Sequence, residues 1–200
     1  MKLKLTTSQS LLILLVTAIF FTSVFAVLVL KPPTLSFLKT ITFDTSLSLL
    51  DHDGTEINSD HFKNQKMMIF FGFTYCPEIC PTTLSDISIW LDEVGTNTDK
   101  IQINFVTVDP ERDTAEELNK YMKNFSSQIV GITGTQIELE KLFTAFGVYA
   151  QKVPFDENSY TVDHSSSIYL VDRNGKLFDV ISYGESLENA VKKLTGFLNY

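Results

Sequence analysis

The fold of this chain is decided by residues 67–81, which read MMIFFGFTYCPEICP. The run 67–73 is apolar throughout, as expected of a strand that is buried on both faces of a sheet. From residue 81 to residue 94 the apolar side chains recur at helical spacing, which predicts an amphipathic helix. Cys76 and Cys80, the only cysteines of the chain, lie in the turn between the two. Peptide N–H groups and the helix dipole favour thiolate over thiol in such a turn.

The segments on either side of this turn read as further strands and helices. They are a hairpin over 47–57 with an Asp-Gly turn, a second central strand over 101–108, helices over about 113–125, 136–146 and 186–198, and a hairpin over 167–181 around Asn174-Gly175. This order predicts an α/β, thioredoxin-like fold with an added N-terminal hairpin. In that fold the functional turn follows the first central strand and opens the first long helix, where the cysteine pair lies.

The N-terminal residues predict a membrane anchor. Lys2 and Lys4 precede an uncharged apolar run over 11–30, which as a helix measures about 30 Å, the thickness of a bilayer core. The positive-inside rule places residues 1–10 in the cytoplasm. We expect a spacer over 31–46 and one domain over 47–200. A cleaved signal peptide is the alternative, but the run exceeds the usual core of about 7–15 residues, and Phe25-Ala26-Val27 is a poor cleavage site.

The charge of the chain restricts its partners. Thirteen basic and 24 acidic residues follow Lys31, so this part carries a formal charge of −11. Nucleic-acid binding is excluded, because attraction to phosphates needs a basic face. A basic protein partner or a cation suits this charge, and a solvated acidic surface explains it equally. In an extracytoplasmic compartment disulfides form readily, so both thiols need a reductant if they are to bind a metal.

The spacing of the two cysteines leaves redox and metal chemistry open. Residues four apart in a helix have Cα atoms about 6 Å apart, within the range for a disulfide, and the same spacing lets both sulfurs face one ion. Thioredoxin-type oxidoreductases have two intervening residues, whereas this chain has three. A static disulfide would close only a five-residue loop and add little stability.

A third ligand would come from the three histidines. His164, in the segment 161–167 (TVDHSSS), immediately precedes a predicted hairpin strand. In a thioredoxin-like fold the loop before that strand lies close to the redox turn. Two thiolates and an imidazole suit copper and are compatible with zinc. A lone histidine is as often structural, so spacing alone leaves both interpretations open. His52 and His61 are interpreted as surface residues without a partner.

Four segments carry a resemblance to a known family. The stretches 72–84 (GFTYCPEICPTTL), 108–114 (VDPERDT), 131–135 (GITGT) and 162–166 (VDHSS) resemble, in order, the signature of the Sco/SenC family. This resemblance implies a membrane-anchored, thioredoxin-like protein that binds copper through Cys76, Cys80 and His164. Tyr75 stands where histidine is frequent, and Glu78 replaces the more usual aspartate; neither change removes a ligand.

The resemblance implies a copper metallochaperone in the bacterial inner membrane, single-pass, with its domain facing the periplasm. Its implied partners are the copper-binding subunit of cytochrome c oxidase, whose binuclear copper site it helps to assemble, and a thiol reductant protein. The alternative is an enzyme, a thiol–disulfide oxidoreductase that keeps the oxidase subunit's cysteines reduced. Cys76 and Cys80 would then form the redox pair, and His164 would be dispensable.

The acidic segment 109–114 is interpreted first as a turn and a helix start, with Asp113 or Thr114 as the N-cap. The resemblance adds a second interpretation, in which Asp109 and Arg112 line the site or contact a partner.

Overall fold

The structure is a computed structural model that describes residue 17 and residues 40–44, 46–95, 98–156 and 159–200. The predicted anchor, the ten residues before it and most of the spacer lie outside the described residues. Among the residues described, no helix has the length and apolar character that crossing a bilayer requires. Residues 38–200 form a unit of their own, which carries the fold and the site.

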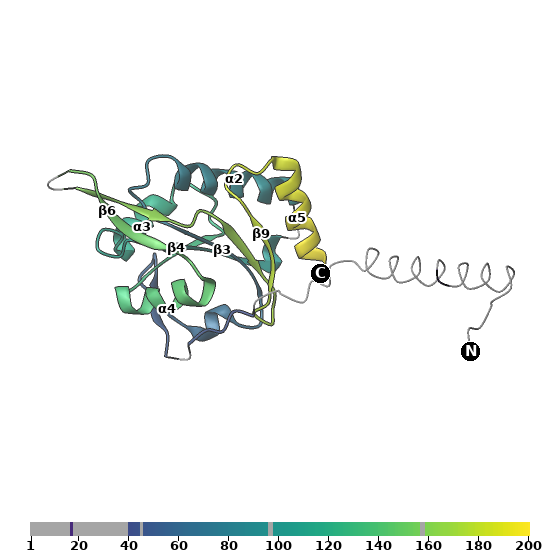
Figure 1. Cartoon of the computed structure of the whole chain (residues 1–200), viewed down its shortest axis with the longest axis horizontal. Helices are drawn as coiled ribbons and strands as arrows, with labels where there is room; N and C mark the ends of the chain where they lie inside the picture. Colours follow the sequence, from purple (N-terminus) through teal and green to yellow (C-terminus); the bar gives the residue numbers. More distant parts are fainter. Residues whose placement is uncertain (1–16, 18–39, 45, 96–97, 157–158) are drawn as a thin grey trace, which may run out of the picture. The chain divides into compact units, whose positions relative to one another are not determined.

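A seven-stranded mixed sheet forms the centre of this unit (Figure 1). The strand order is β2-β1-β5-β4-β3-β8-β9. The central strands β3, β4 and β5 are parallel, whereas β1 pairs with β5, and β8 with β3, in antiparallel fashion. The strands are β1 Ser48–Asp51, β2 Glu56–Asn58, β3 Lys66–Gly72, β4 Ile101–Thr107, β5 Ile129–Thr133, β8 Ile168–Val171 and β9 Leu177–Ile181.

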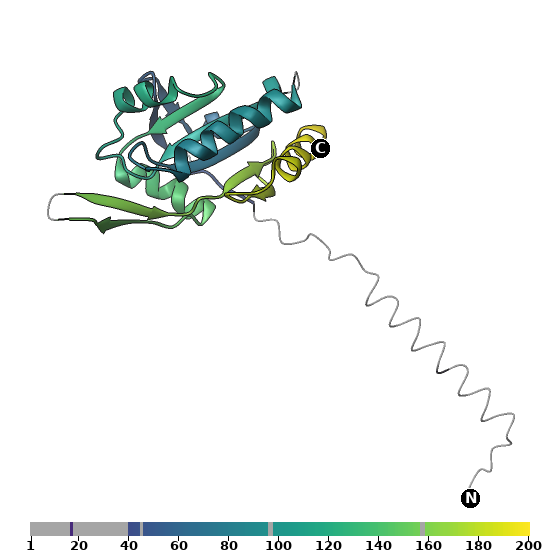
Figure 2. The ribbon, with the colours of Figure 1, turned by 90° about the horizontal axis from the view of Figure 1, so that it is seen from above.

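Helices cover both faces of the sheet, so β3 is buried along its whole length. Helices α2 and α5 pack against each other on one face, and α4 lies on the opposite face (Figures 1 and 2). Neighbouring strand residues point to opposite faces, so Phe70 contacts Phe105 on one side while Phe71 contacts Phe143 of α4 on the other. The helices are α2 Ile79–Val94, α3 Ala115–Met122, α4 Gln136–Phe146 and α5 Leu187–Asn199, with short 3₁₀ turns η1 Ser59–Phe62 and η2 Thr98–Lys100.

Hydroxyl side chains start three of these helices. Thr114, Thr135 and Ser186 each accept a hydrogen bond from the backbone N–H three residues later, which satisfies a donor that has no partner inside the helix. The predicted helix over 136–146 is confirmed, and it ends at Gly147, which adopts the left-handed conformation. Helix α3 ends at Met122, three residues before its predicted end.

Two features of the fold were not predicted. The first is strand β5, which is only five residues long and is interrupted by Gly131, although its other four residues are β-branched. The second feature is an antiparallel ribbon of β6 (Ala150–Pro154) and β7 (Tyr160–His164), which forms a two-stranded sheet of its own. Figure 2 shows this ribbon extending away from the rest of the domain. Most of β6 is exposed, so the ribbon lacks the apolar pattern that marks a sheet strand.

Candidate metal centre

The two cysteines lie where β3 passes into α2. The Cys76 N–H donates to the Phe73 carbonyl at 3.2 Å, which closes the turn, and Cys80 is the second residue of α2. The Cys80 N–H in turn donates to Cys76 Sγ at 3.4 Å. Both thiols are free, with 9% of Cys76 and 0% of Cys80 exposed to solvent. The start of the helix thus points a peptide N–H at the first sulfur.

Gly72, the last residue of β3, makes room for the second sulfur. A Cβ atom at this position would lie 2.8 Å from Cys80 Sγ and 2.7 Å from Cε2 of Phe105. Real Cβ atoms essentially never approach other atoms that closely. The glycine therefore lets Cys80 lie directly against the end of the strand.

His164 reaches the cysteine pair from the far end of the sequence. It is the last residue of β7, not part of a loop as predicted, and its Nε2 lies 3.7 Å from Cys80 Sγ. Its Nδ1 lies 2.9 Å from the Ser165 carbonyl. Only a protonated Nδ1 can donate to a carbonyl, so the neutral ring presents the lone pair of Nε2 to the sulfurs. The Phe73 ring meets the imidazole edge to face, at 5.6 Å between centroids.

The two thiols differ in their affinity for protons. Cys76 accepts a hydrogen bond from the Cys80 thiol, and this interaction is the main cause that lowers the pKa of Cys76 to about 4, against the opposing effect of burial. The backbone N–H groups of Cys80 and Glu78 lower it further. The pKa of Cys80 is raised, because its proton is shared with Cys76 and because it is buried. The pair therefore rests as one thiolate and one thiol.

The three side chains can hold a soft metal ion together. The two Sγ atoms and one ring nitrogen of His164 all lie within 4.8 Å of one another. In the part of the chain that the structure describes, no fourth His, Cys, Asp or Glu joins them. Two thiolates and an imidazole suit copper, whereas structural zinc sites almost always take four ligands. The donor set thus fits copper better than zinc.

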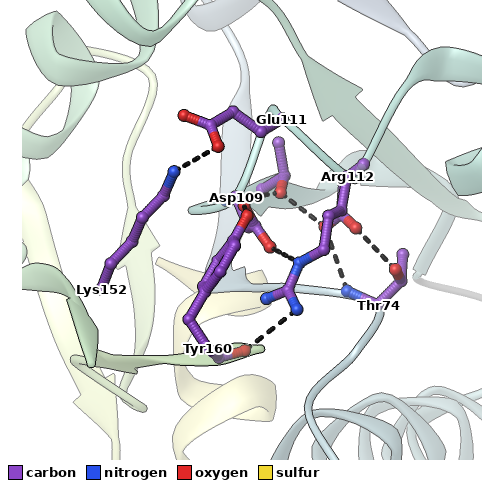
Figure 3. Close-up of polar contacts among 8 residues, drawn as sticks. Thr74, Asp109, Glu111, Arg112, Lys152 and Tyr160 are labelled. Carbon is purple, nitrogen blue, oxygen red and sulfur yellow. Dashed lines mark hydrogen bonds and ion pairs between the residues drawn. The ribbon is translucent and has the colours of Figure 1, made fainter. Parts of the chain in front are cut away.

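The segment after β4 supports the cysteine turn. Asp113 is fully buried and accepts hydrogen bonds from the Thr74 N–H at 3.0 Å, the Thr74 hydroxyl at 2.5 Å and the Thr107 hydroxyl at 2.6 Å. Figure 3 shows the contacts of Thr74 beside Asp109 and Arg112. Burial is the main cause that raises the pKa of Asp113. Thr114 is the N-cap of α3, and Asp113, the other candidate, is not. Asp113 instead hydrogen-bonds to Thr74, two positions before Cys76.

The other two histidines have partners, so their interpretation as unpartnered surface residues was wrong. His52 Nδ1 accepts from the Gly131 N–H at 3.1 Å, and His61 Nε2 lies 3.0 Å from Asn104 Oδ1. Burial is the main cause that lowers the pKa of His61. These partners lie 79 and 43 residues away in the sequence, so no local pattern indicates them. Neither histidine joins the cysteine pair.

The chain is similar to proteins of one family. The SCO1/SenC family model matches residues 38–199. The SCO2-like protein RP587 of Rickettsia prowazekii is 39% identical over 130 residues, which are 64% of this chain and 63% of that protein. The mitochondrial SCO1 homolog of Homo sapiens is 37% identical over 135 residues, 66% of this chain and 45% of that protein. The chain therefore spans less than two thirds of the length of these relatives.

Solved structures show the same architecture. Copper-bound ScoI of Bradyrhizobium japonicum superposes with a TM-score of 0.70 and 35% identity, covering 78% of this chain and 99% of that one. Yeast Sco1 superposes with a TM-score of 0.70 and 30% identity, covering 76% and 95%. The mixed α/β, thioredoxin-like fold is thus confirmed. Because the family model spans all the described helices and strands of the domain, the chain belongs to the SCO1/SenC family.

Proposed function

We propose that this protein is a copper metallochaperone that assists assembly of the binuclear copper site of cytochrome c oxidase. The observation that carries the proposal is the convergence of Cys76, Cys80 and His164, with ligand atoms within 4.8 Å of one another. The copper-bound ScoI structure supports it, because that protein shares this fold at 35% identity. Copper is here the cargo, held until an acceptor takes it.

The proton states of the ligands define how the cargo binds. Cys76 offers a thiolate at neutral pH, and His164 offers a free lone pair on Nε2. Cys80 has to lose its proton, so binding releases that proton and the affinity falls as the pH falls. Because Cys80 has no exposed surface, an acceptor's thiolates would first replace Cys76 or His164, the two ligands with some exposure. Ligand exchange then proceeds from the surface inward.

Copper titration of the reduced, full-length chain against a competing chelator tests this function. We expect about one copper ion per chain, loss of tight binding in Cys76→Ser and Cys80→Ser, and strongly weakened binding in His164→Ala. His52→Ala is the matched control, because it removes a histidine that lies outside the site, and it should keep the wild-type affinity. Wild-type affinity in Cys80→Ser would show that the site is misassigned.

A thiol–disulfide oxidoreductase is the second candidate, and the low pKa of Cys76 favours it. In that reaction the Cys76 thiolate attacks a disulfide of the oxidase subunit. Cys80 then resolves the mixed disulfide, so the partner is reduced to two thiols while Cys76 and Cys80 are oxidised. A thiol reductant protein would restore the pair. His164→Ala separates the two functions, since it should keep the reductase activity while its copper binding is strongly weakened.

The membrane tether is part of the same proposal. The apolar run 11–30 would hold the domain on the periplasmic face of the inner membrane, near a membrane-bound acceptor. Fractionation of cells that express the full chain or a chain lacking residues 1–30 tests it. We expect only the full chain in the inner-membrane fraction, with its domain open to protease from the periplasmic side.

A further inference from the structure

The position of His164 depends on how its ribbon is attached. Strands β6 and β7 pair with each other and with none of the seven strands of the main sheet. An isolated two-stranded hairpin is marginally stable in water. The contacts between the ribbon and the rest of the domain therefore decide how far Nε2 of His164 lies from the two sulfurs.

One guanidinium contacts both parts of the chain that carry ligands; Figure 3 shows its contacts with Asp109 and Tyr160. Arg112 Nη1 donates to the Tyr160 carbonyl at the start of β7, at 3.0 Å. The guanidinium carbon lies 3.8 Å from the centroid of the Tyr160 ring and 4.7 Å from that of Tyr75, the neighbour of Cys76. Such cation–π contacts are attractive, and more so when the charge is shielded from water. Arg112 thus lies between the cysteine turn and the ribbon.

A buried carboxylate holds this arginine in place. Asp109 has no exposed surface; its Oδ2 accepts from Arg112 Nε, and its Oδ1 accepts from the Tyr160 hydroxyl at 2.8 Å. A buried charge is tolerated only when it is paired and hydrogen-bonded, and here both oxygens have partners. Each of the three residues Asp109, Arg112 and Tyr160 contacts the other two, and we call this group the clamp.

A second, weaker contact lies beside the clamp. Lys152 of β6 pairs with Glu111 at 2.5 Å, but the two side chains are 42% and 67% exposed. Exposed ion pairs contribute little to stability, because water and salt screen them. This pair therefore offers a matched control: it also joins the ribbon to the 109–114 segment, without burial and without contact to the cysteine turn.

We propose that Arg112 is a positioning residue of the copper centre, because the clamp of Asp109, Arg112 and Tyr160 sets the distance between His164 and the cysteine pair. The copper part of this inference rests on the proposed function, and its structural part does not. Without the clamp the ribbon would keep the contact of His164 with Phe73, the burial of Val162 and the exposed Lys152–Glu111 pair, but it would lose its buried polar contacts with the 109–114 segment.

Hydrogen exchange in the reduced, metal-free, full-length chain tests the structural part. We expect the amides of β6 and β7 to exchange at least tenfold faster in Arg112→Met and Tyr160→Leu, with β3 and β4 unchanged. Glu111→Gln removes the exposed ion pair but keeps Lys152 Nζ, which lies 4.7 Å from the centroid of the Tyr160 ring, in place, and it should stay within twofold of the wild type. Unchanged protection of the ribbon in both clamp variants would overturn the proposal. Arg112→Met leaves the buried charge of Asp109 unpaired, and this can prevent folding. In that case Tyr160→Leu, which keeps the Asp109–Arg112 pair, decides whether the clamp protects the ribbon.

A double-mutant cycle on copper affinity tests whether the clamp acts through His164. We expect Tyr160→Leu to weaken copper binding about tenfold, or about 1.4 kcal/mol, in the wild-type background. In the His164→Ala background the same change should weaken it less than twofold. A tenfold loss in both backgrounds would show that the clamp acts on the cysteines and would overturn the proposal. If the wild type binds no copper, the proposed function fails, and the exchange experiment still decides the role of the clamp.

Discussion

Cys76 and Cys80 are the same residue type four positions apart, yet their surroundings give them opposite proton affinities. Cys76 receives hydrogen bonds from the Cys80 thiol and from peptide N–H groups, whereas Cys80 is more deeply buried and donates. The sequence predicts a thiolate at this turn, and the hydrogen bonds around Cys76, which lower its pKa, agree with that prediction. The sequence does not predict which cysteine keeps the proton, because that depends on burial and on the direction of one hydrogen bond.

The first prediction concerns this thiolate. The pKa of Cys76 is about 4 in the folded chain, below its ordinary value of 9.0. Ionisation therefore stabilises the folded state fully above pH 9, and this stabilisation is lost as the pH falls through about 4. Ultraviolet absorbance of the metal-free chain should show one thiolate per chain at neutral pH, titrating near pH 4.

Two variants check the assignment of that titration. Cys76→Ser should remove it, and Cys80→Ala should move its midpoint upward, because the donating thiol is lost. A thiolate signal in the wild type that appears only above pH 8 would contradict the account.

The second prediction concerns Gly72. Gly72→Ala would place a methyl group 2.8 Å from Cys80 Sγ, so the sulfur or the Phe105 ring has to move. We expect a loss of about 1–3 kcal/mol in the free energy of unfolding, and weaker copper binding than in the wild type. Chemical denaturation and chelator competition measure the two effects.

The matched control is Gly196→Ala in helix α5, where an added Cβ meets no atom within 4 Å. That change should stabilise the chain by about 0.5–1 kcal/mol, because alanine is the better helix former. Wild-type copper affinity in Gly72→Ala would show that the glycine is not needed for the position of the sulfur.

At the scale of the elements, helix α5 is tied to the central strand β3 by one lysine. Lys66 is 8% exposed, and its Nζ donates to the Phe197 and Leu198 carbonyls, both at 2.8 Å. These carbonyls belong to the last turn of α5, where carbonyls run short of helical N–H donors and only the Tyr200 N–H reaches the Phe197 carbonyl, at 3.3 Å. Burial is the main cause that lowers the pKa of Lys66. This lysine thus replaces the missing helical donors.

The third prediction follows from this contact. Lys66→Met should lower the free energy of unfolding by about 1–3 kcal/mol, because the Leu198 carbonyl loses the lysine donor and the Phe197 carbonyl keeps only the Tyr200 N–H. Chemical denaturation measures the loss. Lys63→Met is the control, since Lys63 pairs with the exposed Asp60 and should change stability by less than about 1 kcal/mol. Equal effects of the two changes would contradict this role of Lys66.

The elements that could be predicted are those with a strong local signal. The helix over 136–146 has a hydroxyl cap, apolar periodicity and a terminal glycine, and its bounds agree with the structure. The β6–β7 ribbon carries no such pattern, because most of β6 is exposed. Strand β5 is rich in β-branched residues, but its place in the sheet is decided by pairing with β1 and β4, which no local window contains.

At the scale of the whole molecule, the site exists because three distant segments meet at one end of the sheet. The cysteine turn follows β3, the 109–114 segment follows the neighbouring strand β4, and His164 ends a ribbon 84 residues after Cys80. The spacing of Cys76 and Cys80 alone predicts that the two sulfurs lie close together. The place of His164 beside it came from the family resemblance, which the comparisons confirm. The clamp had no sequence signal beyond Asp109 and Arg112 themselves.

The central claim is that Cys76, Cys80 and His164 bind one copper ion together. X-ray absorption at the copper edge of the loaded, full-length chain tests it most directly. In the wild type we expect copper to be coordinated by two sulfur atoms and one imidazole nitrogen. In His164→Ala we expect the two sulfur atoms without that nitrogen. A first shell that is unchanged in His164→Ala, or one that contains fewer than two sulfur atoms in the wild type, would contradict it.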